Sequence, residues 1–280
     1  MTTARELAAS APRRAARASK PVIRRVWRRA VLARSVDETA GAAARSAVVV
    51  APHPDDETLG CGATIARKRA AGTRVVVVVV TDGRLSHRSE VLSPDDLAAV
   101  RAGEVRAACA RLGVEARDLR LLELEEGSVA ARHDAVTAML ATILDEVRPD
   151  DVLTTYRSDW HVDHQAVSAA TAAAVRAAGR ASRVLEFPIW FWVDGPWGTG
   201  PDGEGSIRRY LGDPVRASRL RTVSVRTDEH LAAKRAALAQ YRSQTTNLTG
   251  ERNWAVMDED LLSLFLAPVE VFVPFGGPAR

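Results

Sequence analysis

Histidines and carboxylates gather in two short segments, His-Pro-Asp-Asp-Glu at residues 53–57 and His-Val-Asp-His at residues 161–164. A neutral imidazole and a carboxylate are ligands that Zn²⁺ accepts, and a catalytic zinc needs three protein ligands plus a position for water. His53 and Asp56 stand three residues apart where a helix is expected to begin, so one helical turn can bring both side chains to one side. His164 could supply the third ligand. The two segments therefore predict a metal site, provided that the fold brings them together.

Each segment alone also has a plain structural interpretation. The first could be a turn before a helix, in which Asp56 or Glu57 only complements the helix dipole. In the second, Asp163 could cap a helix that begins near His164, or it could orient a neighbouring histidine. Short motifs match by accident, so the metal site depends on the joint placement of the two segments.

Four apolar runs, each followed by a helix-like stretch, supply the elements that would position these residues. They cover residues 47–51, 74–81, 118–124 and 151–156. The six consecutive valines at 75–80 cannot alternate between core and solvent, which is typical of a parallel strand with helices on both faces. The alternation predicts an α/β fold with a Rossmann-like, mostly parallel sheet flanked by helices.

The order of strands in such a sheet decides whether the two segments meet. In the commonest order, 3-2-1-4-5-6, the first and fourth strands are neighbours, and ligands bind in the crevice at their carboxyl ends. His53 follows the first of the four runs and His164 follows the fourth. The predicted fold therefore places both histidines in one pocket.

The chain resembles the LmbE-like (PIG-L) N-deacetylase family, in which zinc-dependent enzymes remove acyl groups, usually acetyl, from amino sugars and related amides. The resemblance covers about residues 46–275 and rests on Ala-Pro-His-Pro-Asp-Asp-Glu-Thr-Leu-Gly-Cys-Gly at 51–62, Thr-Asp-Gly at 81–83 and the segment 161–164. Segments 101–113, 186–192 and 234–244 agree more weakly. Val162 stands where the family usually has proline, which we expect to change the stiffness of the loop rather than its ligands.

The resemblance implies a role for each polar residue of the two segments. The positions that match metal ligands are His53, Asp56 and His164, the position that matches the general base is Asp55, and the auxiliary positions are His161 and Asp163. Zinc would activate a water for attack on the amide carbonyl, and Asp55 would accept its proton. The leaving amine could receive a proton from Asp55 or from His161, whose charge state Asp163 could tune. Fe²⁺ or another divalent ion also suits this ligand set.

We therefore expect zinc-dependent hydrolysis of an N-acetyl group on an N-acetylglucosamine-type sugar or glycoconjugate. One alternative is an amidase or deacylase that acts on a larger amide, such as a thiol conjugate. Another is a non-catalytic relative that only binds a glycoconjugate, although the intact set of polar residues argues against it. No Gly-x-Gly-x-x-Gly follows the first apolar run, which disfavours a dinucleotide-binding dehydrogenase.

Positive charge is concentrated at the N-terminus, where residues 1–46 carry +8 and residues 47–280 carry −4. We expect a basic extension over 1–46, with 1–20 disordered and 21–34 forming an amphipathic helix, followed by the deacetylase domain over 47–275. An apolar stripe beside arginines favours packing of this helix on its own domain. Contact with an anionic membrane surface, or with a partner or nucleic acid, is an alternative, and we expect no nucleic-acid partner.

The remaining composition is that of an ordinary enzyme. No run approaches the roughly 18 apolar residues of a transmembrane helix, and two cysteines, Cys61 and Cys109, indicate a reducing cytoplasm rather than a disulfide framework. The C-terminal part is expected to be rich in loops, above all at 194–206 with its five glycines. Residues that could line the pocket mouth are Arg84, His87, Arg88, Trp190 and Trp192, although the tryptophans could equally fill core. Nothing in the sequence indicates an oligomeric state.

Overall fold

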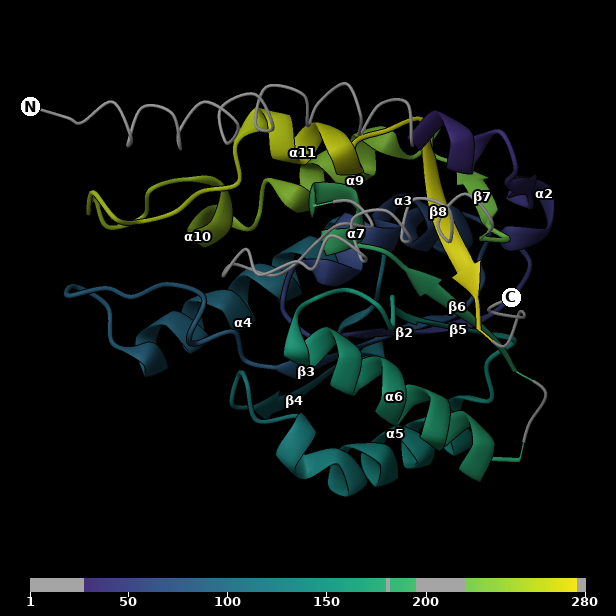
Figure 1. Ribbon diagram of the computed structural model, residues 1–280, viewed down its shortest axis with the longest axis horizontal. Coiled ribbons are helices and arrows are strands. Elements are labelled where there is room, and N and C mark those ends of the chain that lie inside the picture. Colours follow the sequence, from purple (N-terminus) through teal and green to yellow (C-terminus); the bar gives the residue numbers. More distant parts are fainter. Residues whose placement is uncertain (1–27, 180–181, 195–219, 276–280) are drawn as a thin grey trace, which may run out of the picture.

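The computed structural model describes residues 28–179, 182–194 and 220–275, and at its centre these residues form an eight-stranded sheet (Figure 1). The strands are β1 (Val36–Asp37), β2 (Ala47–Ala51), β3 (Val75–Thr81), β4 (Leu119–Leu124), β5 (Asp151–Thr155), β6 (Arg183–Phe187), β7 (Val223–Arg226) and β8 (Val269–Pro274). The helices are α2 (Thr39–Ala42), α3 (Asp56–Ala70), α4 (Pro94–Arg111), α5 (His133–Val147), α6 (Val162–Ala177), α7 (Trp190–Asp194), α9 (Leu231–Leu238), α10 (Arg242–Thr245) and α11 (Glu259–Phe265). Short 3-10 turns lie at Ala116–Asp118 and Ala130–Arg132.

The strand order is β1-β7-β8-β6-β5-β2-β3-β4. The run from β4 to β6 is parallel throughout, while β8 is antiparallel to both β6 and β7. β2 lies between β3 and β5, with Ala47 opposite both Val75 and Asp151. The predicted α/β fold is therefore confirmed, and so is the expected pairing of the first apolar run with the fourth.

The valines of β3 show why this strand reads as a continuous apolar run. Val75, Val77 and Val79 belong to the core beneath α3 and α4, whereas Val76, Val78 and Val80 belong to the core beneath α5 and α6. Helices cover both faces of the strand (Figure 1), so every one of these side chains is removed from water.

Helix α4 is well specified by its sequence, which matters because it brings a buried arginine to the site. Ser93 is its N-cap and accepts a hydrogen bond from the Asp96 backbone N–H, Pro94 occupies the first helical position, and Asp95 and Asp96 lie in the first turn. Each of these choices favours a helix start, because the hydroxyl satisfies a free N–H and the carboxylates complement the helix dipole.

The N-terminal region is described only from residue 28 onward. Residues 28–32 are helical, Val31 is 2% exposed in the core, and the Arg28 guanidinium lies 5.2 Å from the centre of the Trp192 ring. This end of the expected 21–34 helix thus packs on its own domain. The expected disordered segment 1–20 and residues 21–27 lie outside the described residues. The domain boundary at residue 46 stays a prediction, and β1, which precedes it, pairs with β7.

The C-terminal part contributes strands and helices to the same body. Residues 220–275 contain β7, α9, α10, α11 and β8. The glycine-rich segment 194–206 falls almost entirely outside the described residues, and so does its Trp197. Among the described helices, none has the length and apolar character needed to cross a membrane.

Candidate active site

The two polar segments meet at the carboxyl ends of β2 and β5. β2 ends at Ala51 and leads into α3, while β5 ends at Thr155 and leads into α6. His53, His161 and His164 bring ring nitrogens within 4.8 Å of one another. The two segments are more than a hundred residues apart in sequence. They meet because neighbouring parallel strands end at the same edge of the sheet.

Asp56 lies between two of these histidines. Its Oδ2 is 3.2 Å from His53 Nδ1 and 3.3 Å from His164 Nε2, and the residue is 3% exposed. A tetrahedral site with metal–ligand distances of about 2.0–2.1 Å separates its ligand atoms by about 3.3 Å. The two distances from Asp56 Oδ2, besides allowing hydrogen bonds, therefore match the separation of ligand atoms around a divalent metal ion.

The electrostatics of this cluster favour a cation. Burial lowers the pKa of His164, but the charge of Asp56 and a hydrogen bond with Asp159 outweigh it and raise that pKa to about 10. Burial also opposes protonation of His53, yet hydrogen bonds with Asp163 and Asp56 raise its pKa to about 9. The carboxylates thus favour protonation of the ring nitrogens that face them.

His164 is oriented by a residue that the sequence did not single out. Its Nδ1 lies 3.1 Å from Asp159 Oδ2, which leaves Nε2 facing Asp56. Asp159 is 1% exposed and accepts hydrogen bonds from the backbone N–H groups of Ile189 at 3.1 Å and Phe191 at 3.0 Å. A carboxylate on the second nitrogen of a metal-binding histidine fixes its ring. The only signal in sequence was an acidic residue two positions before His161.

Of the two roles expected for Asp163, the structure supports contact with a histidine, whereas the helix cap is His161. Asp163 Oδ2 lies 3.3 Å from His53 Nε2 and accepts a hydrogen bond from the Gly127 N–H at 2.7 Å. The N-cap of α6 is His161, whose Nδ1 accepts from the Asp163 N–H at 3.2 Å. The interpretation of Asp163 as the cap is therefore wrong, because the helix begins two residues earlier than expected and an imidazole nitrogen accepts the N–H bond at its start.

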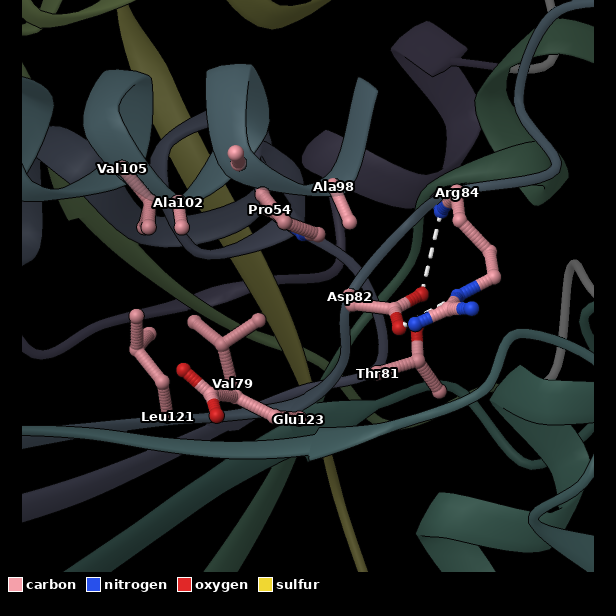
Figure 2. Close-up of a pocket in the computed structure, with 11 residues that line it drawn as sticks. Pro54, Val79, Thr81, Asp82, Arg84, Ala98, Ala102, Val105, Leu121 and Glu123 are labelled. Carbon is pink, nitrogen blue, oxygen red and sulfur yellow. Dashed lines mark hydrogen bonds and ion pairs between the residues drawn. The ribbon is translucent and has the colours of Figure 1, made fainter. Parts of the chain in front are cut away.

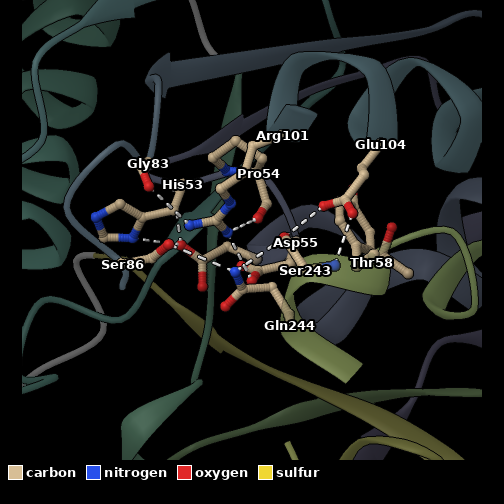
Figure 3. Close-up of polar contacts among 12 residues, drawn as sticks. His53, Pro54, Asp55, Thr58, Gly83, Ser86, Arg101, Glu104, Ser243 and Gln244 are labelled. Atoms are coloured by element: carbon tan, nitrogen blue, oxygen red, sulfur yellow. Dashed lines mark hydrogen bonds and ion pairs between the residues drawn. The ribbon is translucent and has the colours of Figure 1, made fainter. Parts of the chain in front are cut away.

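Asp55 stands apart from the histidines and is held in a strained conformation. Its backbone φ is 122°, a value that residues other than glycine rarely adopt. Its N–H donates to Glu57 Oε2 at 3.1 Å, and its Oδ2 accepts from Arg101 Nη2 at 2.9 Å (Figure 3). Burial raises the pKa of Asp55 to about 7, against the opposing charge of Arg101. This carboxyl group is thus suited to exchange a proton near neutral pH.

Glu57 holds the backbone of Asp55 through a hydrogen bond to its carboxylate. The residue is fully buried and accepts hydrogen bonds from the Tyr241 hydroxyl and from Thr58 Oγ1 as well as from Asp55 N–H. The sequence offered only a dipole-complementing role for Glu57. Tyr241, nearly two hundred residues away, gave no signal at all.

Arg101 links α4 to the Asp55 loop. It is 2% exposed and also donates to Gly83 O at 3.3 Å and to Pro54 O (Figure 3). Gly83 has φ +68°, and a Cβ there would lie 2.5 Å from Arg101 Nη1, so no side chain fits. One turn later, Glu104 accepts from Ser243 N and from Ser243 Oγ, each at 2.7 Å. Ser243 therefore joins α10 to α4 and does more than form a turn.

A cavity of about 240 Å³ lies beside Pro54, between α4 and the carboxyl ends of β3 and β4 (Figure 2). Arg84 lines it and pairs with Asp82 at 2.7 Å. His87 does not line it, but stacks on Trp254 with ring centres 4.2 Å apart. Trp192 is 6% exposed and fills core, in agreement with the simpler of its two interpretations.

Comparisons with known proteins identify the family of this chain. The family model of the GlcNAc-PI de-N-acetylases, PIG-L, matches residues 48–175. A 1D-myo-inositol 2-acetamido-2-deoxy-alpha-D-glucopyranoside deacetylase of Kineococcus radiotolerans is 37% identical over 50% of this chain and 47% of its own length, so the match spans about half of that relative. The deacetylase of the same name from Mycolicibacterium gilvum is 31% identical over 81% of this chain and 89% of its own.

A solved structure shares the fold. A conserved protein of Thermus thermophilus superimposes with a TM-score of 0.54 at 26% identity, over 81% of this chain and 93% of that one. The family model and the relative from Mycolicibacterium gilvum, which is matched over most of its own length and most of this chain, agree. This chain therefore belongs to the PIG-L family of N-deacetylases.

Proposed function

We propose that this protein hydrolyses the N-acetyl group of an N-acetylglucosamine-type sugar or glycoconjugate with the help of a divalent metal ion. The observation that carries the proposal is the convergence of His53 Nδ1 and His164 Nε2 on Asp56 Oδ2, beside the separate carboxyl group of Asp55. The names of the relatives support the substrate class, because they describe deacetylases of an acetamido-glucoside of inositol.

His53, Asp56 and His164 would hold the ion, which we propose to be Zn²⁺. Fe²⁺ suits the same mixture of imidazole and carboxylate. When bound, the ion would lower the pKa of water and polarise the amide carbonyl. Asp159 and Asp163 would keep the rings of His164 and His53 in the orientations that the ion requires, since each accepts from the ring nitrogen opposite to the one that faces Asp56.

Asp55 would act as the general base. Arg101 holds its carboxylate at 2.9 Å and the Glu57 contact fixes its backbone, so the group has little freedom to turn into the metal position. Having accepted a proton, the same carboxyl group could return it to the leaving amine.

His161 would assist from the other side of the site. Its Nδ1 accepts the Asp163 N–H, so the neutral ring carries its hydrogen on Nε2. That N–H could donate to the carbonyl oxygen of the substrate as negative charge develops there. Burial and the charge of His53 lower the pKa of His161 to about 4, which opposes the charged form that would protonate the amine.

The deciding experiment is removal of metal with a chelator, followed by addition of Zn²⁺ or Fe²⁺ and measurement of acetate release. The panel should contain an N-acetylglucosaminyl inositol, simple N-acetylglucosaminides, and amides of a thiol conjugate and of a long acyl chain. We expect metal-dependent acetate release from the glucosaminides. Cleavage of the larger amides alone would show that the acetyl sugar is not the substrate. Binding of the sugars without any hydrolysis would contradict a catalytic role.

A further inference from the structure

Helix α3, which begins with Asp56, is broken near its middle. Cys61 has φ −145° and ψ 22°, so residues 56–60 and residues 63–70 form two helical pieces with different directions. The first piece follows directly on the strained Asp55. Its direction therefore decides where Asp56 and the Asp55 backbone are placed.

A buried ion pair is inserted at the break. In a regular helix, the Ala63 N–H would donate to the Leu59 carbonyl, four residues earlier. Here the Ala63 N–H donates to Glu270 Oε1 at 2.8 Å, and the Leu59 carbonyl accepts from Lys234 Nζ at 2.8 Å. Lys234 Nζ and Glu270 Oε1 are 2.7 Å apart. The ion pair thus occupies the place of one helical hydrogen bond and holds its two ends apart.

Glu270 also caps the second piece of the helix. Its Oε2 accepts from Thr64 N at 2.7 Å and from Thr64 Oγ1 at 2.6 Å. The side chains of Lys234 and Glu270 are 0% and 2% exposed. Two charges so far from water are tolerated only when each is paired and hydrogen-bonded, and the broken helix supplies those bonds.

The glycines on either side of Cys61 let the break pack tightly. A Cβ on Gly60 would lie 2.1 Å from the Phe187 ring at the end of β6. A Cβ on Gly62 would lie 3.2 Å from Lys234 Cγ. Both sides of the break are therefore fixed by close neighbours as well as by hydrogen bonds.

We propose that the Lys234–Glu270 ion pair is a positioning element for the metal site, which holds α3 open at Cys61 and so aims its first turn. Lys234 comes from α9 and Glu270 from β8, and their described hydrogen bonds reach the helix rather than the histidines. The effect of the ion pair on metal binding rests on the proposed function, whereas its effect on the shape of α3 does not.

The test is Lys234→Met, which keeps an unbranched side chain one atom shorter and removes its charge and its bond to Leu59. We expect Zn²⁺ affinity and kcat to fall about tenfold or more, because loss of residues that orient metal ligands has effects of about this size, with KM changed less than threefold. In the metal-free variant, amide hydrogen exchange of residues 56–60 should be accelerated relative to the parent protein, by a factor about tenfold larger than the acceleration at residues 63–70.

Lys68→Met is the matched control, because Lys68 lies in the same helix and is equally buried. Its side chain is 1% exposed, pairs with Asp151 at 3.0 Å and donates to the carbonyls of Ala42 and Arg45. We expect its loss to lower the unfolding temperature as Lys234→Met does, but to leave Zn²⁺ affinity, kcat and exchange of residues 56–60 within twofold of the parent protein.

Equal losses of affinity and kcat in both variants would overturn the inference, and so would unchanged exchange of residues 56–60 in Lys234→Met. If that variant does not fold, Thr64→Val removes one bond to Glu270 and should show the same pattern at about threefold; a parent-like Thr64→Val would then reject the inference. A parent protein that binds Zn²⁺ but deacetylates nothing would refute the proposed function alone. Affinity and exchange would still decide the role of the ion pair.

Discussion

The two ends of β5 both bury charge, but they balance it differently. At the amino end, Asp151 is contacted by Lys68 at 3.0 Å and by Arg45 and Arg183, each at 3.1 Å. At the carboxyl end, Asp56 and Asp163 face histidines, which lose their charge when deprotonated. Asp163 Oδ1 is moreover buried without a hydrogen-bond partner in the described structure.

The difference separates a structural cluster from a binding one. At the amino end the protein supplies its own permanent cations, so nothing further is needed. At the carboxyl end, neutrality depends on protons held by His53 and His164, whose pKa values are raised to about 9 and about 10. In the proposed metal site, a bound cation would take the place of these protons and balance the carboxylates instead.

The sharpest way to break this comparison is His164→Ala. We expect loss of Zn²⁺ binding and of detectable acetate release, since the variant removes one of three proposed ligands. Metal content after dialysis and turnover would be measured together. Retention of one bound zinc per chain with normal turnover would show that the cluster is not the metal site.

Asp55→Asn should remove the base and leave the ligands in place. We expect kcat to fall by about 10²–10⁴, the range for a general base, with Zn²⁺ affinity close to that of the parent. Isothermal titration with zinc and steady-state kinetics would check both quantities. A variant with parent-like kcat would rule out Asp55 as the base.

Asp159→Asn tests the residue that orients His164. The amide can still accept one backbone N–H but no longer offers a carboxylate to Nδ1, so we expect metal affinity or kcat to fall about 10–100-fold. KM should change little, because Asp159 is buried behind the ring. If the loss appeared in KM alone, Asp159 would be acting on the substrate instead.

Asp151→Asn probes the opposite end of β5 and should have the smallest effect on turnover. It leaves the buried ammonium of Lys68 without its carboxylate, so we expect a loss of about 3 kcal/mol in the free energy of unfolding, measured by urea denaturation. The kcat of the folded enzyme should stay within twofold. A large drop in kcat would mean that the two charged ends are coupled through the strand.

Much of the site could be predicted because it depends on local pattern and on a common strand order. The valines of β3 indicated a strand covered on both faces, which predicted a parallel sheet. In the commonest order of such a sheet, the strands that precede His53 and His164 are neighbours, as observed. Proximity of these histidines needed no knowledge of side-chain packing.

The residues that escaped prediction are those whose partners come from distant elements. Arg101 reaches Asp55 from α4, and Glu270 reaches α3 from β8, which lies between β6 and β7. Periodicity carries no information about such crossings. The role of Asp163 was predicted wrongly for a more local reason. Either His161 or Asp163, two residues apart, could have been the N-cap of α6.

The ion pair within α3 also bears on the order in which the protein acquires its parts during synthesis. The ribosome makes the residues around His53 early, those around His164 next, and Lys234 and Glu270 much later. A nascent chain that has released both histidine segments would still lack the carboxylate that caps the second half of α3. With the proposed role of the ion pair, metal loading would follow the pairing of β8 with β6 and β7, so that formation of β8 would complete the site.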